Sequence, residues 1–282
     1  MIATMNRYGS LAVLLCAAAL TACDYDKNAV QDITAPAVPG AEVRFFNFGI
    51  SAPGVNFYAG DRKMTAINFT GCTNPPASTT EPCISSGSES TTGVIYGGVA
   101  AGGLYAGVDP GQHTLSGRIA ATTDKGVVIS NATTTLANGM KYSYYQSGIY
   151  NTTTKAVDAF VVEDPIPAAI DWSTATVRLV HAVYNANPMT LYAKDRVTGV
   201  EVALGGVTAY KSAGAFTALP PGAYDLSTRY AGSSTNAMAR TNVSFAEGRV
   251  YTITARGNIT VTPTTTACAA ANITCLDNTA NR

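Results

Sequence analysis

Apolar and polar residues alternate over short runs along most of the chain. Examples are the series Tyr142, Tyr144 and Gln146 and the series Tyr251, Ile253 and Ala255. A period of two indicates half-buried antiparallel strands. Turn residues separate these runs at Pro53-Gly54, Pro110-Gly111, Asp124-Lys125-Gly126, Asn138-Gly139, Pro220-Pro221-Gly222 and Glu247-Gly248. The pattern predicts an all-β fold of antiparallel β-sandwiches, immunoglobulin-like or transthyretin-like, with a smaller barrel as the alternative.

The strand pattern occurs twice. Val43–Phe48 and Phe57–Ala59 match Val177–Ala182 and Leu191–Ala193 at one constant offset. At a smaller offset, Gly97–Val99, Pro110–Gly111 and Gly139–Tyr142 match Gly205–Val207, Pro221–Gly222 and Gly248–Tyr251. A fixed internal period indicates tandem structural units. We therefore expect two sandwich domains, with an insertion in the first copy between Ala59 and Gly97.

The repeats set the expected domain boundaries. The first domain covers 41–164 with an inserted loop at 70–92, and the second covers 175–263. The linker 165–174 contains two prolines, which stiffen it, and Trp172, which we expect to wedge between the domains. The segment 264–282 is expected to be a C-terminal tail that carries a Cys pair.

The N-terminus has the layout of an export signal, with Arg7 followed by the apolar run Leu11–Leu20. Ten helical residues span about 15 Å, half of a ~30 Å hydrocarbon core. Residues 1–22 are therefore expected to be a cleaved signal peptide. Leu20–Cys23 resembles the lipobox of bacterial lipoproteins, which implies that the Cys23 sulfur carries diacylglycerol and that 23–40 is a flexible tether to the membrane. An ordinary secretory signal is the alternative.

Four further cysteines form two local pairs in polar segments. These pairs are Cys72 with Cys83 and Cys268 with Cys275. In an exported protein such pairs predict disulfides. A zinc site is the alternative, but the spacings exceed the usual two to four residues between ligands and the chain has only two His, so we expect no metal.

Charge and motifs exclude several functions. The chain has 18 Lys plus Arg and 18 Asp plus Glu, so it has no basic footprint for nucleic acid. No catalytic or cofactor motif appears, and we expect neither a catalytic residue nor a cofactor. His113 and His181 lie in strand patterns and are interpreted as structural residues. Glu163 and Asp164 are expected to be solvent-exposed, with calcium binding as the alternative.

Three pairs of residues recur at equivalent positions of the two copies without being obvious core residues. They are Arg44 with Arg178, Tyr58 with Tyr192, and Arg118 with Arg229. Tyr and Arg are suited to binding sugars, peptides or a partner protein, so these residues form a possible binding face. The alternative is that the Arg stems cover the sheet and that Tyr closes an edge of the core.

Three segments of the second copy carry a family resemblance. Val177–Ala182, Leu219–Tyr224 and Arg249–Thr252 resemble the domain of unknown function numbered 4397, found in secreted and lipid-anchored bacterial proteins. The resemblance covers most of 41–263 and implies fold and location, because no activity is established for that family.

Together these features predict a lipid-anchored cell-envelope protein of non-catalytic type. Its sandwiches would serve adhesion, scaffolding or the binding of envelope polymers or a partner protein. The alternatives are an envelope hydrolase that uses His181 or the inserted loop, and a structural spacer. We expect the outer membrane or the cell surface rather than the inner membrane.

Overall fold

The computed structural model describes residues 40–65, 92–269 and 273–281. The expected signal peptide, the lipidation site Cys23, the tether, and the inserted loop up to residue 91 with Cys72 and Cys83 lie outside the described residues. The described part is almost entirely β-structure in sandwiches, which confirms the predicted fold class. No helix within it is long and apolar enough to cross a membrane.

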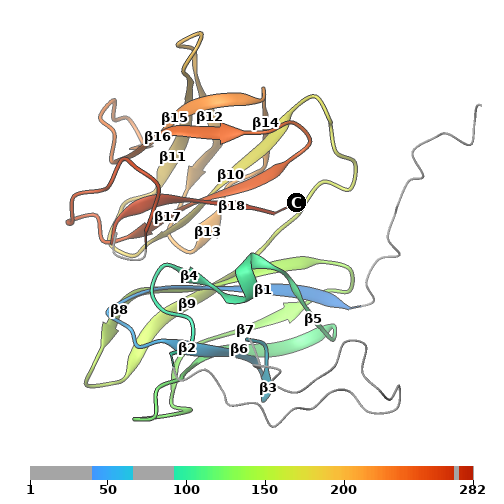
Figure 1. The fold of residues 1–282 in the computed structure, drawn as a ribbon, viewed down its shortest axis with the longest axis vertical. Coiled ribbons are helices and arrows are strands. Elements are labelled where there is room, and N and C mark those ends of the chain that lie inside the picture. The colour runs from blue at the N-terminus through green and yellow to red at the C-terminus, as the bar shows by residue number, and fades with distance from the viewer. Residues whose placement is uncertain (1–39, 66–91, 270–272, 282) are drawn as a thin grey trace, which may run out of the picture. The chain divides into compact units, whose positions relative to one another are not determined.

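The first sandwich consists of two sheets (Figure 1). One sheet has the order β4 (Gly98–Val99), β1 (Ala41–Ile50), β8 (Lys141–Asn151), β9 (Ala156–Glu163), and β5 (Ala106–Val108) also pairs with β1. The other has the order β3 (Arg62–Lys63), β2 (Val55–Ala59), β6 (Gly111–Ile119), β7 (Val128–Leu136). A short 3-10 helix, η1 (Ala100–Gly103), follows β4.

The second sandwich repeats this arrangement strand for strand. One sheet has the order β13 (Ser212–Ala213), β10 (Ala175–Val183), β17 (Val250–Gly257), β18 (Cys275–Ala280), with β14 (Thr217–Leu219) also on β10. The other has the order β12 (Glu201–Thr208), β11 (Met189–Asp195), β15 (Gly222–Tyr230), β16 (Met238–Phe245). Because β10 to β18 pair in the order in which β1 to β9 pair, the two halves share one topology.

One strand pair in each sandwich differs from the expected antiparallel arrangement. The neighbours β1 and β8 are parallel, and so are β10 and β17, whereas every other pair of named strands in the described part is antiparallel. Parallel neighbours require a long connection. Here the chain between the two parallel strands also forms the strands of the facing sheet. The alternation of residues within a strand does not depend on the direction of its neighbour, so it gives no sign of this parallel pairing.

The register corrects one match between the two copies. Val99 pairs with Phe46, and Ala213 pairs with Val180. The structural equivalent of Val99 is therefore Ala213, whereas the expected match, Gly205–Val207, lies in β12. Three small residues resemble each other by composition alone, and only hydrogen bonding identifies which strand they belong to.

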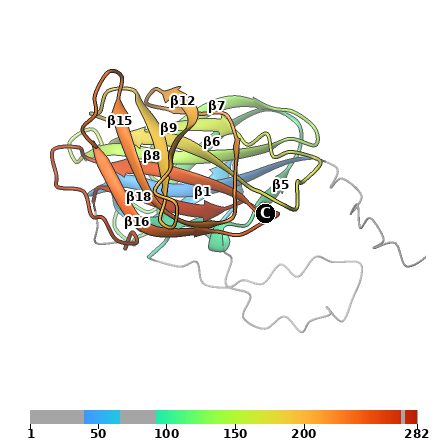
Figure 2. The same ribbon diagram turned by 90° about the horizontal axis from the view of Figure 1, so that it is seen from above.

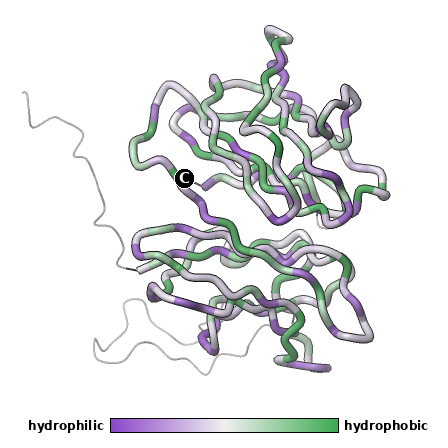
Figure 3. Tube along the Cα trace, turned by 180° about the vertical axis from the view of Figure 1, so that it is seen from behind, coloured by the Kyte–Doolittle hydropathy of each residue, from purple (hydrophilic) through white to green (hydrophobic). Residues whose placement is uncertain are grey.

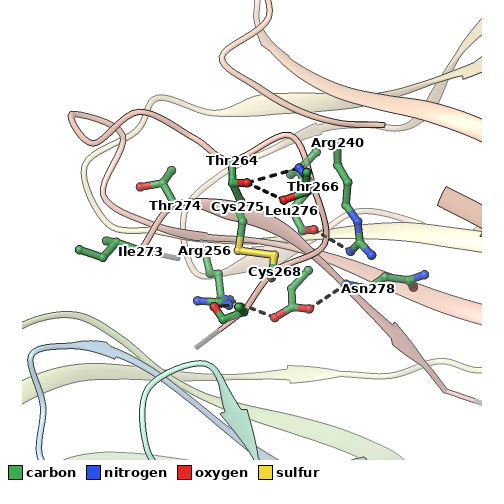
Figure 4. The surroundings of a disulfide bond; sticks show 12 residues. Arg240, Arg256, Thr264, Thr266, Cys268, Ile273, Thr274, Cys275, Leu276 and Asn278 are labelled. Carbon is green, nitrogen blue, oxygen red and sulfur yellow. Dashed lines mark hydrogen bonds and ion pairs between the residues drawn. A yellow bond between two sulfur atoms is a disulfide. The ribbon is translucent and has the colours of Figure 1, made fainter. Parts of the chain in front are cut away.

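The expected C-terminal tail is also corrected, because it contains the strand β18. This strand pairs with β17 from Tyr251 opposite Ala280 to Arg256 opposite Cys275, and thereby completes the sheet as β9 does in the first sandwich. The predicted disulfide between Cys268 and Cys275 is present and joins β18 to the loop before it (Figure 4). Leu276 is the only large apolar residue of β18, so no alternation marks the strand in the sequence.

Each sandwich has its own core, and a third apolar cluster joins the two. Hydrophobic and hydrophilic positions alternate along the strands in Figure 3, as a half-buried sheet requires. The joining cluster contains Phe46, Phe48, Tyr145, Phe160 and Val162 from the first sandwich, and Val180 and Ala182 from the second. The sheets of β1 and β10 thus pack face to face, and Figure 2 shows the second sandwich overlying the first.

Trp172 does not wedge between the domains. It is 74% exposed. Its ring lies over Gly248, where an added Cβ would come within 2.4 Å of Cε3. The linker thus places Trp172 at the edge of the second sandwich, and the contact between the sandwiches is made by the sheets themselves.

Candidate functional site

Arg44 and Arg178 are not on an open binding face. Both side chains are almost fully buried where the two sandwiches meet. Their strands have one face toward the sandwich core, and the opposite face, which was expected to meet solvent, meets the other sandwich. The prediction that these two residues belong to a binding face is therefore wrong.

Asp164, which was expected to be exposed, is the carboxylate between these arginines and is only 2% exposed. It accepts hydrogen bonds from Arg178 Nη2, from Tyr105 Oη at 2.7 Å and from Ser143 Oγ at 2.5 Å. Arg44 Nε lies 3.6 Å from the same carboxylate. Two guanidinium groups thus share one buried carboxylate, an arrangement whose desolvation cost is offset only while the carboxylate stays charged.

The contacts of the two arginines are reciprocal between the sandwiches. Arg178 of the second sandwich binds Asp164, the residue after β9, and Arg44 Nη2 of the first donates to Asn281 Oδ1, 2.6 Å away and directly after β18. Each Nε donates to a hydroxyl of the neighbouring parallel strand, Ser143 for Arg44 and Thr252 for Arg178. The sandwiches are therefore joined as the subunits of a symmetric dimer are joined.

An aromatic ring of the same sandwich covers each of the two buried guanidinium groups. The Tyr105 ring centroid lies 4.7 Å from Arg44 Cζ, and the Phe216 centroid lies 4.5 Å from Arg178 Cζ. Burial raises the pKa of the Tyr105 hydroxyl, so it remains a hydrogen-bond donor to Asp164. These residues act in holding the sandwiches together, and this leaves the outer sheets as the candidate site.

The remaining residues of the possible binding face come together as two pairs on the outer sheets. Arg118 Cζ lies 4.2 Å from the Tyr58 ring centroid in the first sandwich. Arg229 Cζ lies 4.5 Å from the Tyr192 centroid in the second. Both are cation–π contacts between neighbouring strands, and both guanidinium groups remain partly exposed.

Each of these outer pairs has an acidic partner that the sequence analysis missed. Arg118 Nη2 donates to Asp61 Oδ1 at 3.2 Å, and the Arg229 guanidinium donates to both carboxylate oxygens of Glu201, at 2.6 and 2.8 Å. Asp61 lies directly before β3 and Glu201 is the first residue of β12, and each of these strands pairs with the strand of its Tyr, so a comparison of the starts of β3 and β12 would have paired them. The repeated unit is therefore a Tyr–Arg–acid triad on each outer sheet.

Comparison with known proteins finds one family match, which lies in the second sandwich. Residues 175–275 match the family model described as "Domain of unknown function (DUF4397)". The match runs from the first residue of β10 to the first residue of β18. No curated protein matches the chain. Among solved structures, the Bacillus anthracis TIE protein aligns over 78% of this chain at 12% identity, with a TM-score of 0.23. This chain spans 34% of that protein.

The matched residues include His181, the candidate base of the hydrolase alternative. Its ring is fully buried, and burial lowers its pKa. The Val183 amide donates to Nδ1 at 3.2 Å, and Nε2 lies 3.1 Å from the Asn187 carbonyl. Both ring nitrogens are therefore engaged by the backbone.

Asn47 has the same role in the first sandwich. Its Oδ1 accepts from the Gly49 amide at 3.1 Å, and its Nδ2 donates to the Val94 carbonyl at 2.7 Å. Each of the two residues accepts a hydrogen bond from the amide two residues further along its own strand, β1 or β10. His113, in turn, contacts the Asp109 carbonyl through Nε2 at 2.7 Å. Within the described ranges no group of three His, Cys, Asp or Glu residues is placed to hold a metal ion.

Proposed function

We propose that the protein is a non-catalytic, lipid-anchored component of the bacterial cell envelope that binds an envelope polymer through its outer sheets. The observation that carries the proposal is the Tyr–Arg–acid triad, which recurs on the outer sheet of each sandwich. The sheets that contain β1 and β10 are buried against each other where the sandwiches meet. The recurring polar groups that remain accessible are therefore those of the outer sheets.

The first sandwich is proposed to be a second, diverged copy of the DUF4397 domain. The identical strand order supports this proposal, as do the equivalent contacts of Asn47 and His181. A lipid anchor at Cys23 is supported by the Leu20–Cys23 motif, and the surface or outer membrane is the proposed location. Phase partitioning in detergent tests the anchor, because Cys23→Ala is expected to move the protein from the detergent phase to the aqueous phase.

Retention on purified envelope polysaccharide and peptidoglycan tests the binding proposal. We expect the double variant Arg118→Ala/Arg229→Ala to lose retention that the full-length protein shows. Arg196→Ala is the matched control, because it removes an exposed Arg that pairs with Asp225 rather than with a Tyr–Arg–acid triad. Retention of the double variant at the wild-type level would favour the spacer function instead.

A further inference from the structure

The two outer triads differ in how far the chain satisfies the guanidinium group. Arg229 uses all three of its nitrogens, since Nη1 and Nη2 donate to Glu201 and Nε donates to Asn236 Oδ1 at 2.7 Å. Arg118 uses one, because only its Nη2 donates, to the Gly60 carbonyl at 2.7 Å and to Asp61. Within the described ranges, Arg118 Nη1 and the buried Nε make no hydrogen bond. The Arg of the first triad thus keeps donors that are free to bind a ligand, whereas Glu201 and Asn236 occupy the donors of Arg229.

The acidic partner of Arg118 is also left open. The Asp61 side chain is fully exposed, and only its Oδ1 contacts Arg118. Asp61 is one methylene shorter than Glu201 and lies in a turn, and it contacts its Arg through one oxygen where Glu201 uses two. In this part of the chain Oδ2 therefore remains available as an acceptor beside an available donor, Arg118 Nη1.

These two groups lie in a pocket with further hydroxyl and amide groups. The pocket has a volume of about 240 Å³, and Thr114, Ser116, Asn131 and Val128 line it with Gly60, Asp61 and Arg118. Thr114, Ser116 and Arg118 alternate along β6, so their side chains share the outer face of the sheet. A ligand there meets hydroxyl, amide and charged groups beside the apolar side chain of Val128.

We propose that this pocket of the first sandwich binds one unit of a neutral glycan, whereas the equivalent place in the second sandwich does not bind. Each sugar hydroxyl both donates and accepts, which suits the pairing of Arg118 Nη1 with Asp61 Oδ2. The opposite charges of Arg118 and Asp61 give the pocket no net charge to favour an anion. The inference rests on the proposed function and narrows it to one sheet and one class of polymer.

The test measures binding of the full-length protein in detergent micelles to immobilised polysaccharides. The neutral probes are dextran, mannan, galactan and laminarin, and polygalacturonate is the acidic comparator. On the neutral polymer that the wild type retains, Arg118→Ala is expected to weaken binding about tenfold or more, the effect of losing a charged hydrogen bond. Asp61→Ala is expected to weaken it as well, and this fully exposed position leaves folding intact. Arg229→Ala is expected to stay within about twofold of the wild type.

The outcomes separate this inference from the proposed function. If Arg118→Ala and Arg229→Ala weaken binding equally, the outer sheets bind but the assignment to the first sandwich is wrong. Retention on polygalacturonate alone, lost at high salt by screening, overturns the neutral class. If the wild type retains none of the neutral probes, the inference fails even where envelope material is bound. If neither Arg variant affects retention on any polymer, both the inference and the proposed function fail.

Discussion

Replacement of Asp164 by Asn tests how the two sandwiches are held together. Asp164 contacts Arg44, Arg178, Ser143 and Tyr105 at once. Asn has nearly the same shape as Asp, so the substitution keeps the packing and removes the charge. It leaves two guanidinium groups buried where the sandwiches meet, with no carboxylate between them.

The expected cost is large on the scale of a folded domain. Removal of one partner from a buried ion pair typically costs about 3 to 5 kcal/mol, because the remaining charge is left desolvated and uncompensated. The stability of a typical domain is about 5 to 15 kcal/mol. Arg178 donates a hydrogen bond to Asp164, whereas Arg44 Nε lies 3.6 Å from its carboxylate, so most of the cost is expected to fall on Arg178.

Urea unfolding followed by far-UV circular dichroism measures the change in free energy, and proteolysis of the linker 165–174 reports separation of the sandwiches. Asp158→Asn is the matched control. Asp158 also connects the sandwiches, through Lys211 at 2.7 Å, but both side chains are about 40% exposed. An exposed pair contributes about 1 kcal/mol or less. Equal losses for Asp164→Asn and Asp158→Asn would refute the role assigned to the buried carboxylate.

Three further predictions concern stability. Burial lowers the pKa of His181, so below about pH 6.5 the unfolded chain binds the proton more strongly and stability falls with acid. His181→Asn should reduce the change in the urea midpoint between pH 7.5 and 5.5. An unchanged dependence of the midpoint on pH would contradict this prediction. Cys275→Ser should cost about 2.5 kcal/mol by calorimetry, as loop closure predicts, and dithiothreitol should bring the wild type to the same value. Gly257→Ala places Cβ 1.9 Å from the Ile273 carbonyl oxygen, at a residue whose φ is 115°. The melting temperature of this variant should therefore fall well below that of the control Gly139→Ala, whose Cβ meets nothing within 4 Å.

The sequence predicted those features that short-range patterns control. Alternation along most of the strands predicted the β-sandwiches, because period two follows from the pleat of a single strand. The repeated segments Val43–Phe48 and Val177–Ala182 predicted that two units share a plan, and both segments lie in equivalent strands, β1 and β10. The pairing of Cys268 with Cys275 was predictable because the two residues are only 7 apart.

The sequence could not show which groups the second face of a strand meets. Arg44 and Arg118 both interrupt apolar strands, and from the sequence both belong to one possible binding face. The fold buries Arg44 against the other sandwich and leaves Arg118 at the surface over Tyr58. Neighbouring residues along the chain do not record whether a sheet face meets water or another sheet.

The sequence by itself thus determined the strands, their repetition and the local disulfide, since each depends on residues close together in the chain. Only the tertiary structure decided the parallel pairs at the centre of two sheets, the burial of Asp164 between two arginines and the addition of β18 to the second sandwich. The physical reason is the same in each case. These features join residues far apart in the chain, and the free energy that fixes them comes from the burial of sheet faces against each other.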